Sequence, residues 1–173
     1  MSMTTTQGRL DPQGMIRTVE KRVARETDPR KIQMLQTLLA HMRAESAKDI
    51  DALLATVADA VHYHTWAPGG ETQSPEGPAE VRAFYTNKAE EGFLDFQYDI
   101  ERLLVDENVI VTEGVMVSHV PSRSLGAFGF PDTGGLVALS MRMTIFWPFD
   151  DEGLLLGEDS YSHVLGLAPV EAE

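Results

Sequence analysis

One short segment near the C-terminus, GEDSYSH at residues 157–163, concentrates side chains that can move protons. In an extended strand alternate residues share a face. One face would carry the acid, phenol and imidazole of Asp159, Tyr161 and His163, and the other would carry Glu158, Ser160 and Ser162. We expect the first set to face a pocket, with Asp159 or His163 as general base and Tyr161 as donor to a developing oxyanion. Alternatively, Asp159 pairs with a basic residue or faces solvent, and a β-bulge would exchange the two faces.

A second group lies in the segment VHYHTW at residues 61–66. His62 and His64 are two residues apart, so both side chains point to one face of a strand and Tyr63 points to the other. Paired imidazoles can hold a metal with a third ligand from Glu113, His119 or Asp159, but no spacing requires one, so we predict no metal and no cofactor. We expect His64 or Tyr63 to enter a pocket as donor. The alternative is that both histidines lie on the outer sheet face or at a dimer surface.

Several other residues are candidates for contacting a ligand. His119 ends a predicted strand, where it is either a base at the mouth of a pocket or a surface side chain. The methionines of the strand after residue 135 either fill the core or line a cavity, since methionine adapts to irregular shapes. The full predicted contact set is Tyr63, Trp66, Tyr85, His119, Phe128, Met141 and Met143. The glycine-rich connection at 121–135, with Leu125, Phe128 and Phe130, would close over a ligand or bind a partner subunit.

Arg142 is the only cation between residues 124 and 173. It stands between Met141 and Met143, and a buried arginine needs an anionic partner. Glu113 or Glu158 can supply that partner. We favour such a structural pair over contact with an acidic substrate.

The elements that position these residues follow from periodicity and turn signals. Asp11-Pro12 and Asp28-Pro29 each predict a helix start, the second for a helix over about 29–47, and Asp49 begins a shorter helix. A strand at 61–66 leads into a loop, and Pro78 opens a helix ending near Gly92. Four extended segments complete the chain, at 93–105, 108–120, 136–149 and 154–167. This order predicts an α+β fold with helices on one face of a strongly curved antiparallel sheet.

Composition excludes several classes of protein. The 173 residues are 43% hydrophobic and contain no cysteine, which excludes disulfides, thiolate zinc sites and a cysteine nucleophile. The net charge of −13 argues against a nucleic-acid partner. Residues 1–48 are nonetheless basic, with nine Lys or Arg against five Asp or Glu. They lie either on an acidic surface or, as we favour, on solvated faces. We expect a cytoplasmic protein because we find neither an apolar run long enough for a membrane span nor a signal peptide.

The order of elements resembles the nuclear-transport-factor-2-like superfamily, and most of all its SnoaL-like branch. Three segments carry the resemblance: ADAVHYHTWAPGG at 58–70, EGPAEVRAFY at 76–85 and DEGLLLGEDSYSH at 151–163. In the last of these, His163 stands where the family pattern often has a catalytic Asp. The resemblance divides the chain into an N-terminal extension with a basic helix at 1–28, a cone domain at 29–166 and a tail at 167–173.

The resemblance implies a cystatin-like cone, in which the curved sheet wraps around the N-terminal helices, here with an extra N-terminal helix. It also implies an internal pocket for a small hydrophobic molecule and a homodimer formed through the sheet. Family members include isomerases, dehydratases, cyclases and epoxide hydrolases, so cofactor-free acid–base catalysis is the leading hypothesis. A non-catalytic ligand-binding or protein-assembly module of the same fold is the alternative. A small subunit of a ring-hydroxylating dioxygenase is a further possibility that no residue favours.

Overall fold

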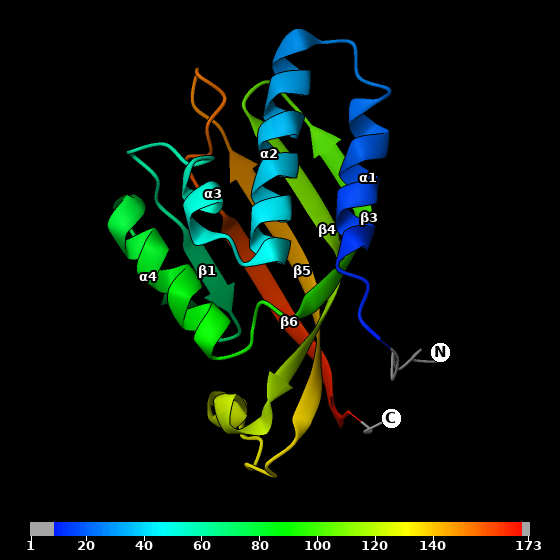
Figure 1. Ribbon diagram of the computed structural model, residues 1–173, viewed down its shortest axis with the longest axis vertical. Coiled ribbons are helices and arrows are strands. Elements are labelled where there is room, and N and C mark those ends of the chain that lie inside the picture. The colour runs from blue at the N-terminus through cyan, green and yellow to red at the C-terminus, as the bar shows by residue number, and fades with distance from the viewer. Residues whose placement is uncertain (1–8, 171–173) are drawn as a thin grey trace.

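The computed structural model describes residues 9–170 as four helices, one 3-10 turn and six strands (Figure 1). In chain order the helical elements before the main strands are α1 (Gln13–Val23), α2 (Pro29–Ala47) and α3 (Ile50–Leu54). The short strands β1 (His64–Ala67) and β2 (Gly70–Gln73) and the helix α4 (Gly77–Glu90) follow. The chain ends with β3 (Phe96–Val105), β4 (Val109–Pro121), the 3-10 helix η1 (Ser122–Phe128), β5 (Leu136–Pro148) and β6 (Asp159–Pro169).

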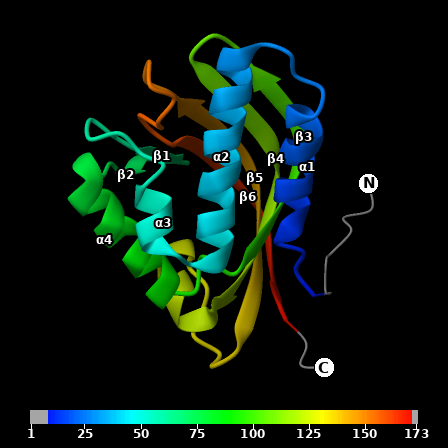
Figure 2. The same ribbon diagram turned by 45° about the horizontal axis from the view of Figure 1, so that its top comes forward.

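All six strands form one curved, unclosed sheet in the order β2-β1-β6-β5-β4-β3. Neighbouring strands are antiparallel except β1 and β6, which run parallel. After β2 the chain crosses to β3 at the other edge of the sheet, and β4, β5 and β6 then follow in order until β6 lies beside β1. The helices cover the concave face, with α1 and α2 over β3 to β5 and α4 beside β1 (Figures 1 and 2). The α+β fold with a curved sheet and helices on one face is therefore confirmed.

The helix α2 lies over the middle of the concave face of the sheet (Figures 1 and 2). Asp28 caps it by accepting hydrogen bonds from the backbone N–H groups of Arg30 and Lys31, and Pro29 stands at the first position. Leu35 and Leu38 of its apolar stripe are completely buried, whereas Ile32 is partly buried. The helix α1 packs against α2 and β3 and contributes Met15, Ile16 and Val19 to the same core. The helix in the predicted N-terminal extension thus packs on the same core as α2.

The large core under the helices and a smaller core beside η1 are separate clusters. The smaller one consists of Val120, Leu125, Val137 and Leu139. Met141 is only partly buried and contacts both clusters. Met141 therefore connects the two clusters on the concave face.

Three local features differ from the expectations. The sequence GGETQ, predicted as loop, includes β2, which pairs with β1 as a hairpin. The connection at 121–135 contains η1, whose Leu125 is buried and whose Phe128 is exposed. The predicted tail begins inside β6, which continues to Pro169, and residues 1–8 and 171–173 lie outside the described part.

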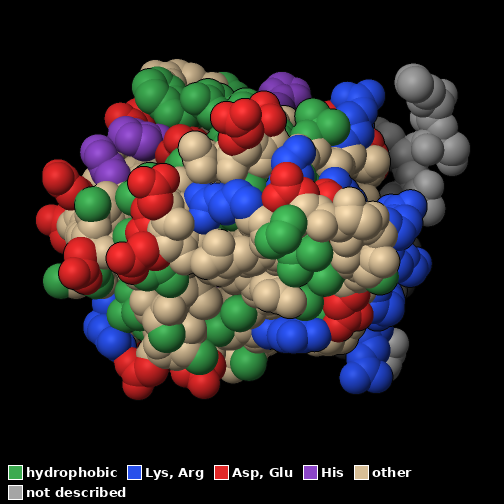
Figure 3. All heavy atoms as spheres, turned by 90° about the horizontal axis from the view of Figure 1, so that it is seen from above, with side chains coloured by type: hydrophobic (Ala, Val, Ile, Leu, Met, Phe, Trp, Pro, Cys, Tyr) green, Lys and Arg blue, Asp and Glu red, His purple; other side chains and the backbone are tan. Residues whose placement is uncertain are grey.

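Basic side chains gather on the side of the molecule where α1 lies, and acidic ones spread over the opposite side (Figure 3). On α1 the basic residues pair with nearby acids: Arg17 with Asp11, and Arg22 with Glu26 at 2.5 Å. The Arg17–Asp11 pair is exposed to solvent, whereas the Arg22–Glu26 pair is partly buried. Within residues 9–170 no helix is long and apolar enough to cross a membrane.

Candidate functional site

The register of β5 and β6 decides which side chains of β6 face the helices. Ser160 pairs with Ile145, which is buried in the main core, whereas Asp159 pairs with Phe146, which is 40% exposed on the outer face. Because cross-strand partners share a face, Glu158 and Ser160 point toward the helices and Tyr161 and His163 point outward. The structure thus selects the second of the two sets that alternation defines on this strand.

Glu158 ends a chain of hydrogen bonds that runs through the interior. The hydroxyl oxygen of Tyr85, on α4, lies at hydrogen-bond distance, 2.6 Å, from Oε2 of Glu158. Nε2 of His41, on α2, lies 3.1 Å from the same hydroxyl, and its Nδ1 lies 2.8 Å from Oγ1 of Thr56. Thr56 is also 2.6 Å from the carbonyl oxygen of Leu53. His41 and Tyr85 are fully buried, whereas Glu158 is only partly buried.

The protons of this chain can take two orders. Burial lowers the pKa of His41 to about 3, so its ring is neutral and only one nitrogen carries a proton. In the first order the Thr56 hydroxyl donates to the carbonyl oxygen of Leu53, so Nδ1–H of His41 donates to Thr56. The Tyr85 hydroxyl then donates to Nε2 of His41, and a protonated Glu158 donates to Tyr85. If Thr56 instead donates to Nδ1, then Nε2–H donates to Tyr85, which donates to an ionised Glu158. The charge of Glu158 and the tautomer of His41 therefore change together.

A second carboxyl lies close to the first. Burial, reinforced by the negative charge of Glu158, raises the pKa of Glu45 to about 8. Burial likewise raises the pKa of Glu158, which Lys88 and the hydrogen bond from Tyr85 counteract. Two like charges in a poorly solvated place are not ionised together without cost, so near neutral pH one of the pair holds a proton.

Tyr63 adds an unused donor beside this pair. Its side chain is fully buried, and its hydroxyl has no hydrogen-bond partner among the described residues. Its ring meets those of Phe84 and Tyr85 edge to face. Burial, and next the charge of Glu158, raises the pKa of Tyr63 well above its usual value, so the hydroxyl keeps its proton. A buried hydroxyl without a partner is costly, so Tyr63 is a candidate hydrogen-bond donor.

His62, just before β1, and His64, its first residue, lie on the opposite face from Tyr63, as their alternation predicts. The rings of His62 and His64 are 4.2 Å apart, and both are partly exposed. His64 bonds Oε1 of Glu71 through Nδ1 at 2.5 Å, and His62 bonds Ser74 at 2.7 Å. Asp159 pairs with His64 across the strands, and burial raises the pKa of its carboxyl. Among residues 9–170 no three His, Asp or Glu side chains converge into a metal-binding group.

The outer face of the sheet carries an aromatic cluster instead of the predicted pocket lining. Trp66 stacks on Tyr161 with an interplanar angle of 5°, and Phe146 meets Tyr161 edge to face. Arg142 lies on this outer face opposite His163 and binds Glu101 at 2.6 Å and Glu113 at 3.6 Å. The ion pair with Glu113 was expected, whereas Glu101 was not and Glu158 takes no part.

The remaining predicted contact residues are scattered. Met143 and Met141 lie on the concave face, the first buried and the second partly exposed. His119 lies near the end of β4, away from the Glu45–Glu158 pair. Phe128 is exposed on η1. The structure therefore brings together only Tyr63 and Tyr85 of the predicted set around the carboxyl pair.

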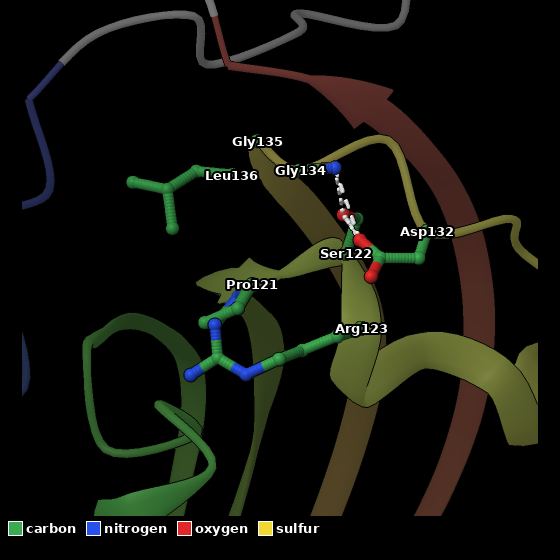
Figure 4. A pocket seen from close by; sticks show the side chains of 7 residues that line it. All are labelled: Pro121, Ser122, Arg123, Asp132, Gly134, Gly135 and Leu136. Atoms are coloured by element: carbon green, nitrogen blue, oxygen red, sulfur yellow. Dashed lines mark hydrogen bonds between the residues drawn. The ribbon is translucent and has the colours of Figure 1, made fainter.

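A pocket of about 270 Å³ opens where β4 meets η1 (Figure 4). Its polar groups satisfy one another: Ser122 donates to Asp132 at 2.6 Å and accepts from the N–H groups of Thr133 and Gly134. Figure 4 shows Arg123 extending toward Pro121, away from those bonds. The Ser122 hydrogen bond lowers the pKa of Asp132. These hydrogen bonds hold the connecting loop in place, and they already occupy the polar groups of Ser122 and Asp132 that a ligand would otherwise bind.

His41 and Glu45 were not predicted as site residues, although a signal was present. They are four residues apart on α2, so they share a face of the helix. His41 follows Leu38 by three residues on the apolar stripe, which places it inside the core. A titratable pair along a buried helical stripe is the pattern that points to them.

The comparisons with known proteins agree with this architecture. Residues 38–156 match the SnoaL-like domain. The chain belongs to the SnoaL-like family. No protein of curated function matches this SnoaL-like chain in sequence.

Three solved structures illustrate the likeness of this SnoaL-like protein to known folds. A protein named as a SnoaL-like polyketide cyclase from Shewanella putrefaciens has a TM-score of 0.67 and 13% identity, over 86% of this chain and 87% of that one. A second protein so named, from Shewanella denitrificans, has a TM-score of 0.62 and 18% identity, over 75% of this chain and 90% of that one. An epoxide hydrolase from Mycobacterium tuberculosis has a TM-score of 0.59 and 15% identity, over 78% of this chain and 86% of that one. At these identities the likeness establishes the fold.

Proposed function

We propose that this SnoaL-like protein binds a small, largely apolar molecule on the concave face of its sheet and transfers protons to and from it without a cofactor. The observation that carries the proposal is the partly exposed Glu158 at the end of a sealed hydrogen-bond chain, with the unpartnered hydroxyl of Tyr63 beside it. Methionine and aromatic side chains supply the surrounding apolar surface. This revises the predicted acid–base set, because His64, Asp159, Tyr161 and His163 belong to the other face.

The roles follow from the positions of the protons. Glu158 in its ionised order is the general base, and the change of His41 tautomer keeps every group behind it bonded. Tyr63 donates to the oxygen on which negative charge develops. Glu45, held protonated near neutral pH by its raised pKa, is the second donor. Such a set suits isomerisation, dehydration, cyclisation or epoxide opening, the last two being reactions named for structural neighbours.

The test uses 2-tetralone, a ketone with acidic α protons, and 2-naphthol, which resembles its enol. We expect saturable binding of 2-naphthol by NMR titration and faster exchange of the α protons of 2-tetralone in D2O. Glu158→Gln should reduce the exchange at least tenfold. Asp159→Asn, the adjacent residue on the other face, is the matched control and should leave it unchanged. Absence of saturable 2-naphthol binding, or exchange lost in Asp159→Asn and kept in Glu158→Gln, would refute the proposal.

A second proposal concerns assembly. The exposed cluster of Trp66, Phe146 and Tyr161 covers the outer face where β1, β6 and β5 adjoin. Aromatic side chains are enriched in protein interfaces, and a twofold dimer uses the same surface patch on both subunits. A homodimer through the sheet would cover this cluster. If the concave face binds a molecule without turning it over, the same dimer would serve a non-catalytic assembly role.

A further inference from the structure

A second, larger pocket lies at the C-terminal end of α2, and its lining shares no residue with the proposed acid–base site. Its volume is about 490 Å³, within the range of small-molecule sites. The N-terminal segment, the last turn of α2, the connection from α4 to β3, and the ends of β4 and β5 all contribute to its wall. We propose that this pocket is a separate binding site for a small apolar carboxylic acid.

The walls are apolar and partly open to solvent. Leu10, Leu94 and Phe96 line the pocket together with Leu136, which is 47% exposed despite its size. An exposed leucine on a concave surface is an uncovered apolar contact that a ligand can bury. Each CH₂ group so buried stabilises the complex by about 0.8 kcal/mol, which favours a ligand with a hydrocarbon body.

The polar groups favour a carboxylate head. Arg9 lines the pocket, and a guanidinium binds a carboxylate through two parallel hydrogen bonds. His119 also lines it, and its Nε2 is buried without a hydrogen-bond partner among the described residues. Asp95, the one acid in the lining, forms an ion pair with Lys48 at 2.7 Å and is therefore largely neutralised toward an incoming anion. Burial lowers the pKa of His119, so Arg9 is the one cation in the lining, and with the Lys48–Asp95 pair it leaves a single positive charge in excess there, in a protein of net charge −13.

The frame of the pocket is held by specific contacts. The backbone N–H of Asp11 donates to Oε1 of Gln97 at 3.1 Å, which fixes the N-terminal segment on β3. Gly92 has a φ of 82°, and an added Cβ would lie 2.7 Å from Cδ of Pro121. Glycine at this position therefore allows the connection to approach the end of β4 and close that side of the wall. A ligand meets a pocket that is largely formed in advance, which lowers the entropy cost of binding.

The experiment compares 4-phenylbutyrate with its neutral isostere 4-phenylbutyramide by calorimetry and amide NMR. We expect the acid to bind saturably, at least tenfold more tightly than the amide, with shifts at residues around Leu94 and His119. Arg9→Gln should weaken the acid about tenfold and bring it close to the amide. Leu136→Glu should weaken both probes, and, since the side chain is half exposed, it should leave the fold intact.

Two controls separate this proposal from the one above. Arg25→Gln removes an exposed arginine just after α1 whose side chain bonds only the carbonyl oxygen of Lys21 among the described residues and does not line the pocket, so it should leave binding of the acid unchanged. Glu158→Gln should also leave it unchanged. Binding lost in Glu158→Gln would assign the acid to the other site and overturn this inference. Equal affinity for acid and amide, or no saturable binding of the acid, would overturn it as well.

Discussion

The hydroxyl of Tyr85 lies 2.6 Å from Oε2 of Glu158, and it is the only atom that joins this carboxyl to the buried imidazole of His41 in the described hydrogen-bond network. One phenol from α4 thus connects the start of β6 to the central helix. Because His41 is sealed from solvent, the carboxyl exchanges its proton at one end of a chain whose other end is fixed by Thr56. Tyr85 therefore contributes to this hydrogen-bond chain, whereas the hydroxyl of Tyr63 has no partner among the described residues.

Removing the two tyrosine hydroxyls should separate structure from ligand recognition. Tyr85→Phe leaves His41 without its partner and should lower the free energy of unfolding by about 2 kcal/mol. Tyr63→Phe removes a hydroxyl that has no partner among the described residues, so it should change stability by less than about 0.5 kcal/mol. It should still weaken 2-naphthol binding severalfold. Urea unfolding and NMR titration measure both effects, and equal destabilisation by the two variants would contradict the assignment.

Glu45 should make the protein less stable as pH rises. Its pKa is about 8 in the folded state, above the value near 4.5 of an exposed glutamate. Its contribution to stability is therefore complete below pH 4.5 and is lost as pH rises toward 8. Glu45→Gln lacks this loss, so the variant should gain about 2 kcal/mol over the wild type between pH 5 and 8.5, less than the full shift implies because the side chain is partly exposed.

Denaturant unfolding at several pH values measures the Glu45 contribution. Glu101→Gln, which changes an exposed acid of β3, is the matched control and should parallel the wild type over the same range. A constant difference between Glu45→Gln and the wild type from pH 5 to 8.5 would show that Glu45 ionises normally.

His41 should act in the opposite direction on the acid side. Its pKa is about 3 in the folded state, below the ordinary value of 6.5. Its contribution is complete above pH 6.5 and is lost as pH falls toward 3, because the unfolded chain takes up a proton that the folded chain refuses. Nitrogen NMR of labelled histidine should therefore show a neutral His41 ring at pH 5. A charged ring at that pH, with the fold intact, would contradict the burial argument.

The fold was accessible from the sequence because its signals are local. Asp28 followed by Pro29 is a helix start, and the period of the apolar residues distinguishes α2 from the strands without reference to any other part of the chain. The strand β2 was missed because GGETQ has no apolar alternation, and only its pairing with β1 makes it a strand.

The site was less accessible because its geometry depends on pairing between distant strands. Alternation separates Glu158 from Asp159, but it does not state which of the two faces the core. That choice follows from the register that sets Ser160 opposite the buried Ile145. The same limit applies to Arg142, whose apolar neighbours suggested burial although its own side chain lies on the outer face.

A single glycine permits two strands to approach closely, and its replacement should be costly. A Cβ on Gly114 would lie 2.0 Å from the carbonyl oxygen of Asp99, a backbone atom that side-chain motion cannot relieve. Gly114→Ala should therefore destabilise the protein by about 2–3 kcal/mol. Gly126→Ala, where a Cβ meets nothing within 4 Å, is the control and should be nearly neutral. Similar midpoints of thermal unfolding for the two variants would contradict the close approach.

The exposed aromatic cluster gives the last prediction, which concerns the oligomeric state. If a second copy covers Trp66 and Tyr161, then Tyr161→Lys places a charge in the middle of that interface and should convert a dimer into a monomer. Leu104→Lys changes an even more exposed apolar residue, but on β3, at the opposite edge of the sheet from β1 and β2, and should leave the dimer intact. Light scattering after gel filtration measures the mass directly. A wild-type monomer at high protein concentration, or a dimer that survives Tyr161→Lys and dissociates in Leu104→Lys, would place the contact elsewhere or remove it.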